Sequence, residues 1–171
     1  MKLTSLGIPE VIVVEPEVFE DERGFFFEAF NQKKFNNALG REVFFVQDNQ
    51  SRSKKGVLRG LHYQEQPYAQ AKLVRVLSGL IYDVAIDIRS ESKTYGHWVA
   101  EELSSNNKKQ LWIPEGFAHG YLVLSDYAEV IYKTNNFYNK AFEKTIHWKD
   151  NLFKIDWPVI NTEIITSQKD S

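Results

Sequence analysis

Short runs in which apolar and polar residues alternate limit most strongly what this chain can fold into. In segment 82–89, Tyr, Val and Ile occupy every second position, and most of the positions between them are charged. Segment 72–77 shows a similar alternation, and Ser78-Gly79 separates the two runs. A period of two is the pattern of a β-strand with one polar face. The two segments therefore predict neighbouring strands joined by a turn.

Further short segments rich in aromatic and β-branched residues predict more strands. They are 25–30, 44–50, 95–103, 110–113, 121–124 and 129–133. One helix is expected over 32–39, because Asn31 is a good N-cap and Gly40 a good terminator. A helical or irregular segment is expected after Asp150. Many short strands between turns predict an antiparallel sandwich or barrel, and polar residues on inward faces indicate that it encloses a ligand.

The composition narrows the class of protein. The chain has 171 residues, of which 43% are hydrophobic and 26% charged, which predicts one globular domain over residues 1–171. The net charge of −2 gives no reason to expect a nucleic acid or a membrane as partner. The absence of cysteine excludes disulfides and thiolate chemistry. With no signal peptide or apolar span recognised, a cytoplasmic location is expected.

Two motifs resemble the signatures of the cupin barrels. They are Gly56–Gln64, in which His62 follows Gly56 after five residues, and Trp112–Gly120, which contains Pro-x-Gly-x-x-His. Metal-binding cupins carry His-x-His and a Glu in the first motif. Here Gln64 replaces the second histidine, and no Glu follows at the expected distance. Two histidines are too few for a convincing zinc or iron site, so no metal is expected.

The order and spacing of the motifs from Phe19 to Pro158 resemble the dTDP-4-dehydrorhamnose 3,5-epimerase family. The segments that carry the resemblance are 19–28, 47–51, 56–64, 72–76, 83–89, 114–120 and 128–133, with a fainter match at 167–170. The resemblance implies an all-β, cupin-type jelly-roll barrel with a few short peripheral helices. It also implies a homodimeric isomerase that needs no cofactor and acts on a dTDP-linked 4-keto-6-deoxysugar in L-rhamnose biosynthesis.

The same resemblance implies a role for each catalytic residue. His62 matches the base that removes protons beside the C4 ketone, and an imidazole titrates near neutral pH. Asp170 matches the carboxylate that orients this imidazole, and Asp83 is the alternative, because residue 170 is close to the end of the sequence given. Lys72 matches the cation beside the ketone oxygen, and Tyr132 matches the acid on the opposite face.

Further residues match the family's substrate contacts. Arg23 and Arg59 match its phosphate ligands, and the N-terminal strand region is expected to complete the partner's site, so that Arg23 and Glu28 act across a dimer. The other matches are Gln47, Asn49, His119, Glu143 and Lys169, with Phe26 and Tyr138 placed near the thymine. His97 and His147 are assigned to the surface or to packing.

Three other functions are weighed against the 3,5-epimerase. A mono-epimerase that inverts only C3 or C5 has the same residues, and the sequence does not separate it. A non-catalytic sugar-nucleotide-binding barrel is disfavoured, because binding alone does not require His62, Lys72 and Tyr132 together. A metal-dependent oxygenase fails on the number of ligands. The sequence leaves open the nucleotide, the sugar, the polymer served and the regulation.

Overall fold

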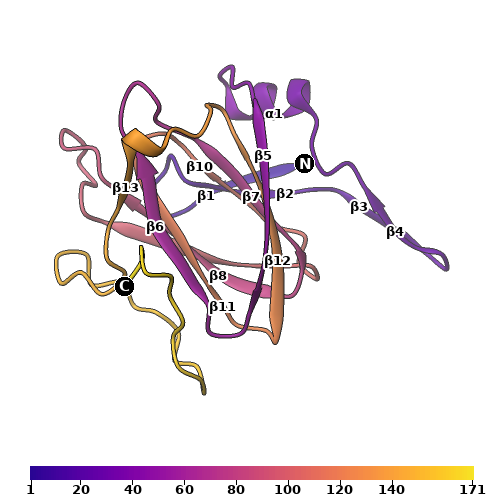
Figure 1. The fold of residues 1–171 in the computed structure, drawn as a ribbon. Helices are drawn as coiled ribbons and strands as arrows, with labels where there is room; N and C mark the ends of the chain where they lie inside the picture. Colours follow the sequence, from indigo (N-terminus) through magenta and orange to yellow (C-terminus); the bar gives the residue numbers. More distant parts are fainter.

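The computed structural model describes residues 1–171 and consists mainly of β-strands (Figure 1). The strands are β1 (Lys2–Ser5), β2 (Ile12–Glu15), β3 (Val18–Asp21), β4 (Gly24–Phe27), β5 (Gln47–Lys54), β6 (Leu58–Gln64), β7 (Lys72–Ser78), β8 (Leu80–Asp87), β9 (Trp98–Ser104), β10 (Gln110–Ile113), β11 (Phe117–Val123), β12 (Tyr127–Thr134) and β13 (Glu143–Thr145). One α-helix, α1 (Gln32–Leu39), and one 3₁₀ turn (Lys140–Phe142) complete the regular structure. Neither is long and apolar enough to cross a bilayer. The all-β prediction is confirmed.

Two antiparallel sheets face each other across the main core. The larger has the order β1-β2-β10-β7-β12-β5, and the smaller has the order β13-β6-β11-β8-β9. Their inner faces share one apolar cluster, to which the larger sheet contributes Val74 and Val130 and the smaller sheet contributes Ile81 and Ala85. Each of these four side chains is buried. Apart from β1–β2 and β8–β9, neighbouring strands in each sheet are not consecutive in sequence, as in a jelly roll. Chain segments far apart in sequence therefore line the space between the sheets.

The strands β3 and β4 form a separate two-stranded hairpin that projects from the barrel (Figure 1). Their residues pair from Val18 with Phe27 to Asp21 with Gly24. Phe25 and Phe26 are 57% and 71% exposed, although both are large apolar side chains. Exposed aromatic side chains that gather on one element are typical of a surface that binds another molecule.

The helix forms where its capping residues predict it. The Asn31 side chain accepts a hydrogen bond from the Lys34 N–H, and Gly40 closes the helix in the left-handed conformation at φ 73°. Phe35 is buried against Trp112 and Phe45. Segment 42–46 is irregular, so the strand predicted from residue 44 begins only at residue 47.

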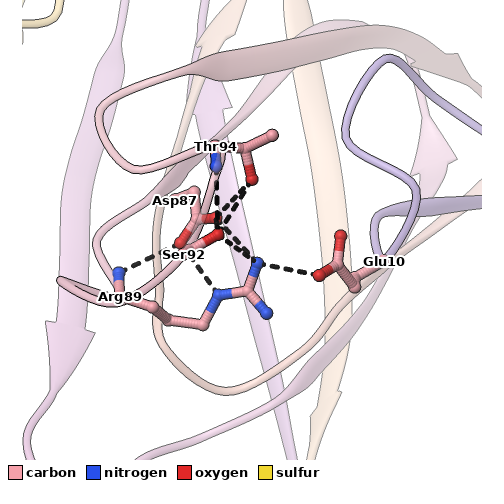
Figure 2. A network of polar contacts seen from close by, with 5 residues as sticks. All are labelled: Glu10, Asp87, Arg89, Ser92 and Thr94. Atoms are coloured by element: carbon pink, nitrogen blue, oxygen red, sulfur yellow. Dashed lines mark hydrogen bonds and ion pairs between the residues drawn. The ribbon is translucent and has the colours of Figure 1, made fainter.

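A buried charge network fixes the loop between β8 and β9 (Figure 2). The Asp87 carboxylate is inaccessible to solvent and accepts hydrogen bonds from Arg89, Ser92 and Thr94, and Arg89 also binds Glu10 near the N-terminus. Burial alone would raise the pKa of Asp87, but these donors outweigh it and hold the pKa far below the usual value. The network ties this loop to the turn before β2.

Two close backbone contacts hold the C-terminal segment against the barrel and the strands β6 and β11 against each other. A parallel bridge joins Val57 to Ile165 and holds residues 163–166 against the barrel. Within the smaller sheet, Gly60 of β6 adopts φ +121°, and a Cβ atom there would lie 2.5 Å from the Cα of Gly120 in β11. Only glycine fits this backbone contact, because an L side chain would meet both strain and collision.

Candidate active site

A cavity of about 360 Å³ opens between the two sheets. Its volume is in the range of small-ligand sites. The predicted residues that line it are Asn49, Arg59, His62, Lys72, His119, Tyr132, Tyr138, Glu143 and Lys169. The side chains come from both sheets, from the loop after β12 and from the C-terminal segment. The predicted barrel therefore encloses a cavity, and the wall of this cavity is mostly polar.

Strand alternation explains why Lys72 points into this cavity. In β7, Lys72 shares a face with Val74 and Val76, which belong to the main core. Lys72 is accordingly only 7% exposed, and its Nζ donates a hydrogen bond to the His62 carbonyl at 3.2 Å. On the neighbouring strand, Tyr132 pairs with Asn49 of β5. Both residues line the cavity.

His62 and Asp170 form a dyad beside the cavity. The His62 Nε2 lies 2.6 Å from Asp170 Oδ1. Asp170 is buried, although it lies in the last turn of the chain, and its backbone N–H donates to Ser167. Burial lowers the pKa of His62, and the hydrogen bond that its ring donates to Asp170 opposes this effect without cancelling it. The ring is therefore neutral at pH 7. Of the two candidate carboxylates, Asp170 is the one in contact with His62.

Asp83 binds a different imidazole. Its Oδ1 lies 2.5 Å from His119 Nε2, and both side chains are buried. The second oxygen of Asp83 is buried and has no hydrogen-bond partner. The backbones of His119 and His62 are paired across β11 and β6. The site thus contains two adjacent His–Asp pairs, and the second pair was not predicted from the sequence.

The ammonium of Lys72 lies among mixed charges. Burial lowers its pKa to about 8, while the charges of Asp83 and Glu143 raise it and the charge of Lys169 lowers it. A lysine with this pKa is still largely protonated at neutral pH. Such a buried cation can stabilise negative charge that develops on a nearby oxygen more strongly than a cation in water can.

Tyrosine and serine hydroxyls form a wall that sequence reasoning missed. Ser51 Oγ lies 2.8 Å from the hydroxyl of Tyr121, and both residues line the cavity. The nearby Ser53 hydroxyl accepts a hydrogen bond of 3.0 Å from Arg59 Nε. Burial raises the pKa of Tyr132, so its hydroxyl keeps its proton at neutral pH. The period-two spacing of Ser51 and Ser53 in β5 was the signal in the sequence that places both on the inner face.

The cavity mouth carries a second charged group. The Glu143 carboxylate accepts hydrogen bonds from Lys169 Nζ and, at 3.0 Å, from the Tyr138 hydroxyl. Burial raises the pKa of Glu143, but these two donors outweigh it and lower the pKa overall. Gln47 is not among the lining residues, yet its side-chain oxygen accepts the Tyr138 N–H at 3.1 Å. Gln47 therefore supports the mouth from behind.

Besides Gln47, three predicted substrate contacts lie outside this cavity. Arg23 and Phe26 are on the projecting hairpin, where Arg23 forms an ion pair with Asp21. Glu28 follows the hairpin and binds Lys34 and Asn31 at the start of α1. Within one subunit, these residues do not join the cavity-lining set.

No group of three or more His, Cys, Asp or Glu side chains is arranged to hold a metal ion. At the position of the missing second histidine, both N–H groups of the Gln64 amide are directed at backbone carbonyls. The hydrogen-bond donors that line the cavity around His62 and His119 include amide, hydroxyl and ammonium groups. These groups can bind an oxygen-rich molecule, and the hydroxyl and ammonium groups can also transfer protons to it.

Comparison with known proteins identifies closely similar chains. A family model described as dTDP-4-dehydrorhamnose 3,5-epimerase matches residues 5–171. The protein of that name from Shigella flexneri is 60% identical over 170 residues, which cover 99% of this chain and 93% of the relative. The one from Pseudomonas aeruginosa is 56% identical over the same coverage of both chains.

Solved structures agree in fold. A crystal structure of the dTDP-6-deoxy-D-glucose-3,5-epimerase of Legionella pneumophila, in complex with dTDP-4-keto-L-rhamnose, superimposes with a TM-score of 0.95. It is 49% identical, and the match covers 99% of this chain and 89% of that one.

Proposed function

The chain belongs to the dTDP-4-dehydrorhamnose 3,5-epimerase family, and on that premise we propose that its barrel epimerises C3 and C5 of dTDP-4-dehydro-6-deoxy-D-glucose. The product is dTDP-4-dehydro-L-rhamnose, the keto precursor of the L-rhamnose nucleotide. The observation that carries the proposal within this chain is the His62–Asp170 dyad at 2.6 Å, whose histidine lines one cavity with Lys72 and Tyr132.

In the proposed reaction, neutral His62 removes a proton from the carbon beside the C4 ketone. Asp170 holds the proton of the imidazole on Nε2, which leaves the lone pair on Nδ1 free to act as the base. When His62 becomes charged, the same carboxylate stabilises the imidazolium. The electron pair of the broken C–H bond moves to the C4 oxygen and forms an enolate.

The enolate is then stabilised and reprotonated by two further residues. The Lys72 ammonium stabilises the negative charge on the C4 oxygen, and because Lys72 is buried, water screens this interaction little. Tyr132, which remains protonated because burial raises its pKa, delivers a proton to the opposite face of the carbon. The configuration at that carbon is thereby inverted. His62 then releases its proton to solvent and the Tyr132 phenolate takes one up from water, after which the same cycle at the second carbon gives the doubly inverted sugar.

The proposed nucleotide contacts lie toward the cavity mouth. Arg59 is fixed by Ser53 and presents its remaining guanidinium N–H groups to the diphosphate. Tyr138, Glu143 and Lys169 are assigned to the nucleoside end, and Asn49 and His119 to the sugar end. Lys169 precedes the dyad carboxylate Asp170 directly, so nucleotide binding and catalysis share one short segment of chain.

We also propose that the active form is a homodimer in which the β3–β4 hairpin of each subunit completes the partner's cavity. The support is that Arg23 and Phe26 lie outside their own subunit's cavity on an exposed, projecting element (Figure 1). An arginine that serves as a phosphate ligand needs a phosphate nearby. A second copy of the chain is the occupant that would bring one within its reach.

Mixing two inactive variants tests this shared site. Arg23→Ala and His62→Ala proteins are each expected to have low activity. After unfolding and refolding together, mixed dimers contain one cavity with both native residues, so activity should recover to about a quarter of the wild-type value. The control is Arg23→Ala protein alone, unfolded and refolded in the same way at the same total concentration. If the mixture stays as inactive as its components, Arg23 acts within its own subunit, and the shared site is contradicted.

The reaction itself is tested by proton exchange with solvent. The purified protein is incubated with dTDP-4-dehydro-6-deoxyglucose in deuterated water, and the recovered sugar is analysed by mass spectrometry and NMR. Deuterium at both C3 and C5, with inversion at both carbons, is expected. His62→Ala protein should give only the background exchange of an enzyme-free sample, and exposed His97→Ala protein should behave as wild type.

The other outcomes separate the alternatives. Label at C3 alone or C5 alone would make the protein a mono-epimerase and would contradict the double epimerisation. No label above background, together with tight binding of the nucleotide sugar, would leave a non-catalytic binding protein of the same fold.

A further inference from the structure

Gln64 at the end of β6 uses its whole side-chain amide to hold two loops at the cavity mouth. Its Nε2 donates to the carbonyls of Tyr68 at 2.7 Å and of Phe137 at 3.2 Å. Its Oε1 accepts the Asn139 N–H at 2.6 Å. The side chain is 94% buried, since its exposed fraction is 6%. Both donors are thus committed to protein, and none is left for a ligand, although Gln64 lines the cavity.

Two of these bonds lie on either side of Tyr138. The carbonyl of residue 137 and the N–H of residue 139 belong to the peptides that flank Tyr138, and Gln64 binds both. The Tyr138 ring is about half exposed, and its hydroxyl donates to Glu143. Tyr138 lies in a loop without regular backbone pairing, so side-chain hydrogen bonds set where its ring stands.

From this geometry we infer that Gln64 is a positioning residue, which sets affinity for the nucleotide by fixing the loop that carries Tyr138. The inference rests on the proposed function, in which Tyr138 contacts the nucleoside end of the substrate. Gln64 stands where metal-binding cupins have a histidine ligand. In this chain the same strand position anchors a loop instead of a metal.

The inference predicts an effect on binding rather than on the chemical step. In Gln64→Leu protein, the loop loses its hydrogen bonds to β6, and Tyr138 must be ordered when the ligand binds. The KM for the sugar nucleotide and the Kd for dTDP alone should each rise about tenfold, while kcat changes by less than about threefold. Steady-state kinetics and isothermal titration calorimetry measure the two quantities.

A second variant keeps the shape of the side chain. In Gln64→Glu protein, a carboxylate can still accept the Asn139 N–H, but it cannot donate to the carbonyls of Tyr68 and Phe137. The same rise in KM and Kd is expected, because two of the three bonds are replaced by repulsion between oxygens. Wild-type affinity in a folded Gln64→Glu protein would overturn the inference.

A control variant and a double variant distinguish positioning from general stability. Gln32→Leu removes another amide that binds a loop carbonyl, at Val43, beside α1 and away from the cavity. It should lower Tm and leave KM and Kd unchanged. If Gln64 acts through Tyr138, then Gln64→Leu combined with Tyr138→Ala should bind dTDP no more weakly than Tyr138→Ala alone.

Two results would contradict the role of Gln64. One is a lower Tm with unchanged Kd in Gln64→Leu protein, as in the control. The other is a double variant in which the two losses of affinity multiply. Because the dTDP titration does not depend on turnover, a failure of the proposed reaction would be seen separately, in the wild-type exchange experiment.

Discussion

Replacement of His62 by asparagine should lower kcat by about three orders of magnitude, while KM changes little. Asparagine keeps a polar side chain of similar reach but cannot take up a proton, so the general-base contribution of about 10²–10⁴ is lost. The measurement is the initial rate of epimerisation, which is monitored either by NMR or through a coupled enzymatic reduction of the product. His97→Asn is the matched control, because His97 is exposed and outside the cavity.

The dyad also predicts the acidic side of the pH profile. The base works only when neutral, and burial lowers the pKa of His62 below the ordinary 6.5. Activity should therefore hold as the pH falls toward 6.5 and decline only below it. Because Asp170 raises the pKa of His62, Asp170→Asn should move this limb to still lower pH while reducing kcat. A limb that moves to higher pH in Asp170→Asn protein would contradict the assignment.

Replacement of Lys72 by methionine should lower kcat by about 10²–10³, through the loss of the cation that stabilises the enolate oxygen. In the wild-type protein, kcat should also fall as the pH rises through about 8, because Lys72 loses its proton there. Lys72→Arg should retain a small fraction of the activity with this limb removed, since arginine stays charged. An unchanged alkaline limb in Lys72→Arg protein would show that another group titrates.

The Lys72→Met variant should separate the effect of Lys72 on activity from its effect on stability. The folded-state pKa of Lys72 lies below the unfolded value of 10.5, so burial of the charged form opposes folding. Between about pH 8 and 10.5, the folded protein binds fewer protons at Lys72 than the unfolded chain does. The free energy of unfolding therefore increases over this range, as the cost of burying the charged amine is relieved. At pH 7, Lys72→Met protein should accordingly have a Tm no lower than wild type, which differential scanning calorimetry would measure.

Parts of the fold with local signals could be predicted from the sequence. The helix over 32–39 has its cap and its terminating glycine. The consecutive strands β7 and β8 have their alternation and the turn between them, although that turn leads from one sheet to the other. The strands β1, β2, β3, β6 and β13 were not predicted. Shortness alone does not account for this, because the four-residue β10 was predicted and the seven-residue β6 was not. Segment 44–46 was misleading: its aromatic residues indicate burial, and Phe45 is packed on Phe35 and Trp112 without strand pairing.

The candidate site was predictable to the extent that single motifs identify residues. His62, Lys72 and Tyr132 were recognised one at a time, and the fold brings them into one cavity. The pairing of Asp83 with His119 was not predicted, because 36 residues separate them and only the register of β8 against β11 brings them together. For the same reason, the choice between Asp170 and Asp83 needed the course of the C-terminal segment.

The contact between Gly60 and Gly120 limits how the sugar pocket of such a barrel can be redesigned. The two glycines lie beside His62 and His119 on adjacent strands, and a Cβ atom on either would meet the backbone of the other strand. Neither position can therefore accept a side chain without displacing the neighbouring strand. An engineer who wants a different sugar accepted has to vary the side chains that line the cavity, which come from β5, β6, β7, β11, β12 and the mouth loops.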